Sequence, residues 1–197
     1  MEIPDLANIA KQYNQDLFYC GVGWLDSAVN LHRKFKEFGN PEFILHLGTA
    51  GVLHAKKNLL DTFITASYCQ PPVKLEEFPA MVELTWQTQI PQFIEKNKID
   101  RSWLYSTPGI SISDNSFDLQ NSVVGQKIEG PFCENMEAAS LSYFCYSLKI
   151  PLVSVISITN FVGRQGRVQW KANFQKAGQL LAQKLIEILE KKLSSKS

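Results

Sequence analysis

The chain has 197 residues, 45% of them hydrophobic and 20% charged, and its formal net charge at pH 7 is +1. This is the composition of a globular protein with one sizeable core, and it gives no electrostatic support for binding nucleic acid or a membrane surface. No apolar run reaches the roughly 18 residues that span a bilayer, and the N-terminus MEIPDLANIAKQ lacks the basic start and apolar centre of a secretory signal. We therefore expect a cytoplasmic protein without a nucleic-acid or membrane partner.

The four cysteines stand singly among apolar neighbours and form no C-x-x-C pair: Cys20, Cys69, Cys133 and Cys145. Buried thiols in a reducing compartment are a better interpretation of this pattern than disulfides or a zinc site. We expect neither a metal site nor a cofactor.

Strand-like apolar runs alternate with helical patterns along the chain. The pattern predicts, in chain order, a strand at 16–23, a helix at 24–38, strands at 42–51 and 59–68, a helix at 85–98, a strand at 102–113, a helix at 136–148, a strand at 151–159 and a helix at 170–193. Strands separated by helices indicate a three-layer α/β fold with a mixed, largely parallel central sheet. Because no internal repeat or linker is visible, residues 1–197 are expected to form a single domain.

Ligands of such sheets bind where strands end and where loops or helix N-termini begin. Three parts of the sequence have this position: HLGTAG at 46–51, STPGISIS at 106–113, and the pair ENMEAAS at 134–140 with SITNFVG at 157–163. In HLGTAG, Gly48 and Gly51 could bring the backbone close to a ligand, with Thr49 adding a hydroxyl group. A tight connection after the strand explains the same residues, and taken alone it is the favoured interpretation.

Glu137 lies near the predicted start of a buried helix, and its carboxylate has two interpretations. Asn135 is a good N-cap, and the positive end of the helix dipole would stabilise a glutamate there. The small residues at 138–140 would however let another backbone or a ligand approach, and a carboxylate beside them could accept two hydrogen bonds from a diol such as ribose.

Asn160 ends a buried strand, where a polar side chain needs a partner. Its amide carries two donor hydrogens and an acceptor oxygen. It could cap the following loop, which is the usual outcome, or hydrogen-bond the edge of a planar heterocycle.

Taken together, these segments resemble the nucleoside phosphorylase/nucleosidase family, which includes methylthioadenosine/S-adenosylhomocysteine nucleosidase, futalosine hydrolase and the purine nucleoside phosphorylases. The shared features are GTAG after a strand, a Met-Glu-Ala helix start and a later apolar strand that ends in Thr-Asn. The segment GVG at 21–23, with the predicted helix behind it, is similar to a further family segment. Leu60 and Asp61 are similar to its Gly-Asp strand entry, with the glycine replaced.

The resemblance implies a role for each candidate residue. It implies that Glu137 binds the ribose hydroxyls, that Met136 packs under the sugar, and that Asn160 hydrogen-bonds purine N7 as the glycosidic bond breaks. The other substrate-binding candidates are Gly48, Thr49, Gly51, Ile110, Asn135, Phe161 and Arg164. It also implies a purine nucleoside as the small-molecule partner and a homodimer as the assembly.

The asparagine at position 160 favours one branch of that family. The resemblance implies Asp here in nucleosidases of adenine, and Asn in futalosine hydrolases and 6-oxopurine phosphorylases. Hypoxanthine presents two acceptors, N7 and O6, which suit an amide NH2 group, whereas adenine presents an acceptor beside a donor. We therefore expect hydrolysis of the N-glycosidic bond of a 6-oxopurine nucleoside, as in futalosine hydrolase. Arg164 and Arg167 are solvated surface in one interpretation, and in the other one of them pairs with a carboxylate of futalosine.

Several positions depart from the family pattern. His46 stands where the phosphorylases have a phosphate-binding arginine, and an imidazole of pKa about 6.5 anchors phosphate weakly, which disfavours phosphorolysis. Ile156 replaces another arginine. The family's first strand and its water-positioning glutamate have no counterpart, because Glu2 and Asp5 are the only acids before Asp16. We therefore expect a fold truncated at its N-terminus.

The missing glutamate leaves an alternative function open. Positioned general-base catalysis is typically worth about 10²- to 10⁴-fold in rate, so the chain could be a weakly active or non-catalytic relative that binds a nucleoside. Methylthioadenosine/S-adenosylhomocysteine nucleosidase-like and phosphorylase-like activities are further alternatives. The sheet edge left open is expected to be covered by the stretch at 3–11 or by a second subunit.

Overall fold

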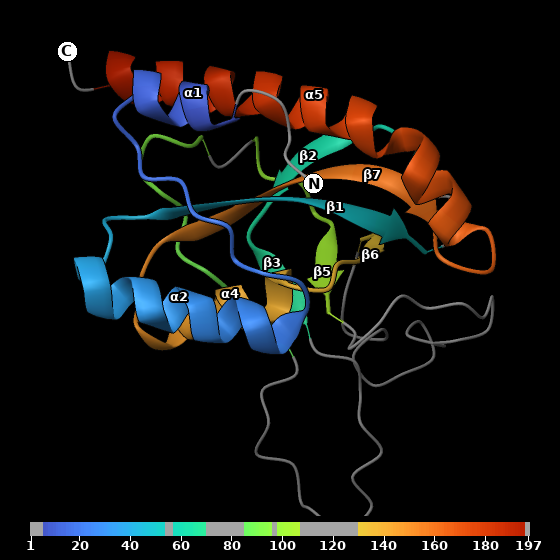
Figure 1. The fold of residues 1–197 in the computed structure, drawn as a ribbon, viewed down its shortest axis with the longest axis horizontal. Coiled ribbons are helices and arrows are strands. Elements are labelled where there is room, and N and C mark those ends of the chain that lie inside the picture. Colours follow the sequence, from blue (N-terminus) through green and yellow to red (C-terminus); the bar gives the residue numbers. More distant parts are fainter. Residues whose placement is uncertain (1–5, 54–56, 70–84, 96–97, 107–129, 196–197) are drawn as a thin grey trace, which may run out of the picture.

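The computed structural model in Figure 1 shows helices on both faces of a central sheet. The structure describes residues 6–53, 57–69, 85–95, 98–106 and 130–195. Helices α1 (Leu6–Gln12) and α5 (Gly166–Ser194) cover one face, and α2 (Trp24–Phe38) and α4 (Ala138–Ser147) cover the other. The expected three-layer α/β architecture is thereby confirmed.

Seven strands form the sheet in the order β2-β7-β1-β6-β5-β3-β4. Their bounds are Ile44–Val52 (β1), Thr62–Thr65 (β2), Ser67–Cys69 (β3), Thr85–Gln87 (β4), Trp103–Tyr105 (β5), Phe132–Glu134 (β6) and Leu152–Phe161 (β7). The sheet is mixed, as expected: β1–β7, β3–β5 and β5–β6 are parallel, and the other three pairings are antiparallel.

Strand β1 is paired unequally on its two sides. All nine of its residues are in register with β7, whereas only Gly51 and Val52 pair with β6. Within the described ranges, no strand pairs with the rest of that edge, from Ile44 to Ala50. The described part of the stretch at 3–11 forms α1, which adds no strand to this edge; it packs through Leu6 and Ile9 against α5 and against side chains of β1.

Strand β7 joins the cores on the two faces of the sheet. Its side chains alternate, as the strand period of two requires. Leu152, Ile156 and Ile158 enter the core under α2 and α4, while Val153 and Val155 enter the core under α5. Each is completely buried, and burying one such aliphatic side chain contributes about 1.5–3 kcal/mol.

The predicted strand at 16–23 is wrong, because this segment is irregular and pairs with no described strand. Its side chains alternate as in a strand, with Leu17 and Tyr19 exposed and Phe18 and Cys20 packed against the core, but its backbone joins no sheet. The backbone carbonyl of Cys20 accepts instead from the side chain of Asn30 on α2 at 3.1 Å. The segment is therefore attached to a helix rather than to a sheet.

Other predicted elements have different bounds. The helix predicted at 85–98 is wrong: Trp86 pairs with Tyr68 in a short strand, and Thr88 donates to the carbonyl of Leu152 at 2.5 Å. The strand predicted at 59–68 is two strands that separate at Ala66, and β6 was not expected. Of the strand predicted at 102–113, only the part up to residue 106 lies within the described ranges.

The conformation of one residue agrees with the family pattern. Leu60 has a φ of 71°, a left-handed conformation that favours glycine, and it stands where the family pattern has glycine. No helix in the described part of the chain is long and apolar enough to cross a membrane.

Gly130→Ala should destabilise the protein more than Gly39→Ala. Both glycines have positive φ values, 130° and 82°, so a side chain is strained at either position. A Cβ on Gly130 would overlap the carbonyl oxygen of Arg101, whereas a Cβ on Gly39 would meet no atom within 4 Å. Urea unfolding should show an additional loss of about 1–3 kcal/mol for Gly130→Ala, the usual range for overpacking. Equal losses in the two variants would contradict this assignment.

Candidate functional site

The carboxyl end of β1 joins several of the candidate residues. Asn135 donates from Nδ2 to the carbonyl oxygen of Thr49 at 2.8 Å. The side chain of Thr49 accepts from the indole Nε1 of Trp170, on α5, at 3.3 Å. The Thr49 hydroxyl keeps its own hydrogen to donate. The loop-like turn expected at GTAG is absent, because β1 continues to Val52 with a bulge between Ala50 and Gly51.

The two glycines of this segment admit neighbouring side chains. Neither has a positive φ. A Cβ on Gly51 would lie 2.6 Å from Nδ2 of Asn160, and a Cβ on Gly48 would lie 3.2 Å from Nδ2 of Asn135. Their role is therefore close approach rather than a sharp turn.

Asn135 acts as the expected cap, although the helix itself begins at Ala138. Its Oδ1 accepts from the backbone N–H groups of Glu137 and Ala138 at 2.9 and 2.7 Å. Because its Nδ2 is committed to Thr49, this amide links the start of α4 to β1. Its role in the structure is to position its neighbours.

Glu137 turns away from the helix axis towards the segment before α2. Its Oε1 accepts from the backbone N–H of Gly23 at 2.9 Å. Burial raises the pKa of this carboxyl above its ordinary value, and the hydrogen bonds from Gly23 and its surroundings counteract the shift only in part. Met136 lies beside the same segment, with its Cε 4.0 Å from where a Cβ on Gly23 would be.

The small residues after Glu137 admit another backbone, which was one of the two interpretations of this segment. Ala138 and Ala139 are buried in the core cluster that also contains Leu31 of α2. The hydroxyl groups of Ser140 and Ser27 are 2.7 Å apart across this contact. The packing therefore explains the small side chains without a ligand, and it brings Gly23 to the carboxylate of Glu137.

Asn160 lies at the end of β7 with its amide held by its neighbours. Its Oδ1 accepts from the hydroxyl of Thr159 at 3.0 Å, and its Nδ2 donates to the carbonyl oxygen of Phe161 at 3.1 Å. A Cβ on Gly166, the first residue of α5, would lie 3.1 Å from the same Nδ2. Asn160 is buried, with 8% of its surface exposed, and its Nδ2 lies against Gly51.

A buried pair near the site was not predicted. Tyr105, on β5, donates to Oε2 of Glu134, on β6, at 3.0 Å, and both side chains are buried. Burial, followed by the charge of Glu134, raises the pKa of Tyr105 above its usual range. Tyr105 is the last residue of a three-residue strand, and no sequence pattern connects it with Glu134.

The remaining candidates are less closely connected to this region. Arg164 is exposed in the turn between β7 and α5, and Arg167 is in the first turn of α5 rather than in a loop. Ile110, Glu2 and Asp5 lie outside the described residues.

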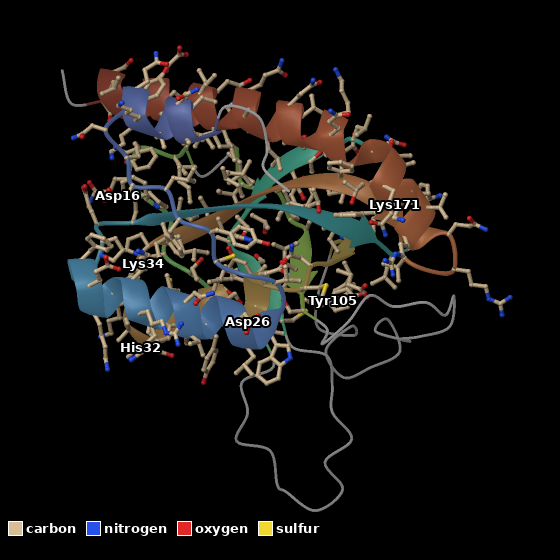
Figure 2. All side chains as sticks on the ribbon, in the orientation of Figure 1. Asp16, Asp26, His32, Lys34, Tyr105 and Lys171 are labelled. Carbon is tan, nitrogen blue, oxygen red and sulfur yellow. The ribbon has the colours of Figure 1, made fainter. Side chains whose placement is uncertain are left out.

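Asp16 is the first acid in the described part of the chain. Figure 2 shows it at the left of the molecule, away from Tyr105 and from the carboxyl end of β1. It therefore does not stand near Thr49. The described residues contain no group of three or more His, Cys, Asp or Glu side chains that could hold a metal ion.

Two surface hollows lie elsewhere. One of about 130 Å³ is lined by residues that include Ile64, Phe93 and Ile188, and one of about 190 Å³ by residues that include Tyr13 and Leu189. Neither is lined by a candidate site residue.

Comparison with known proteins identifies the family of the chain. Residues 13–194 match the family model of the phosphorylase superfamily, which is most of the chain. The chain belongs to the phosphorylase superfamily. The resemblance seen in the sequence is thereby confirmed.

Relatives in the superfamily match along most of their length. A 5′-methylthioadenosine/S-adenosylhomocysteine nucleosidase of Buchnera aphidicola subsp. Schizaphis graminum is 24% identical over 198 residues, covering 92% of this chain and 80% of the relative. The native structure of futalosine hydrolase from Helicobacter pylori superposes with a TM-score of 0.70 at 17% identity, covering 88% of this chain and 78% of that one.

A third match is similar along nearly the whole of both chains. It is a Francisella philomiragia protein proposed to be a 5′-methylthioadenosine/S-adenosylhomocysteine nucleosidase, with a TM-score of 0.75 at 16% identity and coverage of 96% and 95%. At these identities the structures establish the fold alone.

The substitution Glu137→Gln should increase the thermal stability of the protein, compared with wild type, by more at pH 7 than at pH 4.5. Because the folded-state pKa of Glu137 is raised, the protonated form stabilises the fold, and this stability is lost as the pH rises through the folded-state pKa. Glutamine keeps an oxygen for the Gly23 N–H without the cost of burying a charge. Scanning calorimetry at both pH values would measure the difference. Asp26→Asn, which removes an exposed carboxylate, is the control. If Glu137→Gln instead gained less stability over wild type at pH 7 than at pH 4.5, the raised pKa of Glu137 would be contradicted.

Proposed function

We propose that the chain binds a purine nucleoside and hydrolyses its N-glycosidic bond. The observation that carries this proposal is the convergence of a buried carboxylate, Glu137, and a fixed amide, Asn160, on the carboxyl end of β1. Asn135 links the first to Thr49, and Gly51 packs against the second. Membership of the phosphorylase superfamily supports the same reaction class.

Glu137 has the chemistry to hold the sugar. One of its oxygens accepts from Gly23, and a carboxylate has further lone pairs for two ribose hydroxyl groups. Ribose hydroxyls would replace part of the hydration that burial removes, so binding should favour the ionised carboxylate. Hydrogen bonds to a charged acceptor are worth about 1.5–3 kcal/mol each.

Asn160 has the chemistry to recognise the base. The hydroxyl of Thr159 donates to the amide oxygen, and Nδ2 donates one of its two hydrogens to the carbonyl oxygen of Phe161, which leaves one N–H hydrogen for a ligand. That hydrogen suits an acceptor on the edge of a 6-oxopurine, where N7 and O6 stand side by side, whereas adenine places a donor beside N7. In the reaction the C1′–N9 bond breaks with its electron pair moving to the base, and a donor at N7 stabilises that charge as it develops.

A second candidate is cleavage of methylthioadenosine-type nucleosides. It is favoured by the names of the Buchnera aphidicola relative and of a relative from Oceanobacillus iheyensis, which is 25% identical over 198 residues. Futalosine instead carries a carboxylate on its 5′ side, for which the exposed Arg164 is the candidate partner. The two candidates differ in the base and in the charge of the 5′ group, so substrate comparison separates them.

Purine release should be faster from inosine and futalosine than from methylthioadenosine. The expected preference in kcat/KM is about tenfold or more, because one unmatched buried hydrogen-bonding group costs about 1–3 kcal/mol. Asn160→Asp should narrow or reverse it. The assay is chromatographic detection of the free base, with and without phosphate, since only phosphorolysis requires phosphate.

The other results of the purine-release assay distinguish the remaining candidate functions. Equal rates on inosine and methylthioadenosine would remove Asn160 from base recognition, and release from methylthioadenosine alone would establish the second candidate. No release from any substrate, with micromolar binding by calorimetry, would identify a nucleoside-binding relative without catalysis.

We also propose a homodimer formed through an apolar patch on the α2 side of the molecule. The patch consists of Leu17, Tyr19, Val22, Trp24, Leu25 and Val29, each at least 41% exposed. It is continuous along the segment before α2 and the first turns of that helix. Large contiguous apolar patches on soluble proteins mark interaction sites. Glu137 hydrogen-bonds Gly23 inside this segment, so the patch adjoins the proposed nucleoside site.

Leu25→Asp should convert the dimer to a monomer, as measured by light scattering after size exclusion. A charge buried in an apolar interface is strongly unfavourable. Leu193→Asp on α5 is the matched control, because the two leucines are 60% and 57% exposed. A wild-type monomer, or equal dissociation of both variants, would contradict this assignment.

A further inference from the structure

His46 is a buried histidine on β1 that the proposed binding roles do not use. Its side chain is 7% exposed and points into the layer between the sheet and α4, on the same face as Gly48. Its Nδ1 is 2.9 Å from the hydroxyl oxygen of Ser154, on β7. The residue is thus held by the strand pairing that also positions Asn160.

The hydrogen bonds around His46 determine its tautomer. Ser154 Oγ is 3.1 Å from the hydroxyl of Tyr68, and Tyr68 donates to the carbonyl oxygen of Thr65 at 3.3 Å. When Tyr68 gives its one hydroxyl hydrogen to Thr65, Ser154 donates to Tyr68 and therefore accepts from His46. All three contacts are hydrogen bonds together only if Nδ1 carries the proton and Nε2 carries the lone pair.

Nε2 of His46 lies beside Gly48, next to the proposed nucleoside site. Nε2 lies 3.2 Å from where a Cβ on Gly48 would be, and Nδ2 of Asn135 lies 3.2 Å from the same point. A side chain at position 48 would crowd the Cε1–Nε2 edge of the imidazole. Among the residues that the structure describes, none forms a hydrogen bond with Nε2.

We propose that His46 Nε2 is the acceptor that orients the attacking water and receives its proton. This inference rests on the proposed function, because it supplies an acceptor for hydrolysis of the same nucleoside. Gly48 is next to Thr49 and faces Asn135, between the elements that carry the proposed sugar and base contacts. An acceptor here would lie beside C1′, the atom that joins the sugar to the base.

In this hydrolysis every bond, charge and proton is accounted for. The C1′–N9 bond breaks and its electron pair goes to the purine, while a water oxygen forms a bond to C1′. The oxygen then carries a positive charge and releases a proton to Nε2, which makes an imidazolium. That proton returns to solvent or to the departing purine, so no oxidant, reductant or phosphate is needed. Ser154 and Tyr68 act as positioning residues that keep Nε2 free of a proton.

The protonation of His46 agrees with this role. Burial lowers the pKa of His46 to about 4, so the ring is neutral at pH 7 and Nε2 is available as an acceptor. The titratable side chain in its chain of hydrogen bonds is Tyr68, whose pKa burial raises above the usual range. An imidazole of low pKa is a weak base towards water. The oxygen bonded to C1′ is far more acidic, so proton transfer after bond formation remains favourable.

Two substitutions separate the role of Nε2 from that of Nδ1. Asparagine places an amide near Nδ1 and can still donate to Ser154, but it has no atom at the Nε2 position. His46→Asn should therefore fold, bind nucleoside within about threefold of wild type, and lose roughly 10²-fold or more in kcat. His46→Gln places an amide at the Nε2 position and should recover part of the loss, because its oxygen can orient water without accepting the proton.

The positioning residue has its own matched control. Ser154→Ala should lower kcat with little change in KM, because Nε2 is no longer confined to the unprotonated state. Ser157→Ala removes a hydroxyl of equal burial on the same strand that accepts from Thr62 at 3.2 Å, and it should leave kcat unchanged. Equal effects of the two serine variants would show a structural role only and would overturn the assignment.

A tautomer measurement tests His46 independently of activity. Long-range proton–nitrogen correlation spectra at pH 7, assigned with His46→Asn, should show Nδ1 protonated and Nε2 unprotonated. A proton on Nε2, or an unchanged kcat in His46→Asn, would overturn the role of His46 alone. Absence of purine release by the wild-type protein would instead overturn the hydrolytic function on which the inference rests.

Discussion

The parallel pairing of β1 with β7 is the interaction on which the candidate site depends. It places Gly51 beside Asn160, so the missing Cβ of one residue provides the space for the amide of the other. The same register places His46 opposite Ser154, which determines where the imidazole points. A bulge between Ala50 and Gly51 shifts the register before the strand ends. Because β7 contributes to the cores on both faces, this pairing is held by the most completely buried part of the molecule.

The contact between α2 and α4 completes the site at a cost in stability. Small side chains let the two helices approach, and Gly23 then donates to the buried carboxylate of Glu137. Burial raises the pKa of Glu137 because the hydrogen bonds from Gly23 and its surroundings replace only part of the lost hydration. Carboxylates held in this state are typical of functional sites, because a ligand can supply the missing donors.

Glycines have a common function in this region. Gly48 and Gly51 do not adopt backbone conformations that require glycine, yet each faces a polar nitrogen at a distance that a Cβ would make too short. The absence of two side chains thus leaves room beside β1 for the amides of Asn135 and Asn160 and for the imidazole of His46. Asn135 is used for capping, whereas Asn160 and His46 retain hydrogen-bonding capacity for a ligand and for water.

The sequence by itself determined the α/β class, the helix at 24–38, the capping role of Asn135 and the family, because periodicity and side-chain chemistry act over a few neighbouring residues. It could not place the segment at 16–23, whose apolar pattern suits a strand but whose carbonyl is bound by Asn30. It also could not show the pairs Glu137–Gly23, His46–Ser154 and Tyr105–Glu134. These pairs join residues on different elements, so only the register of the strands and the packing of the helices decided them.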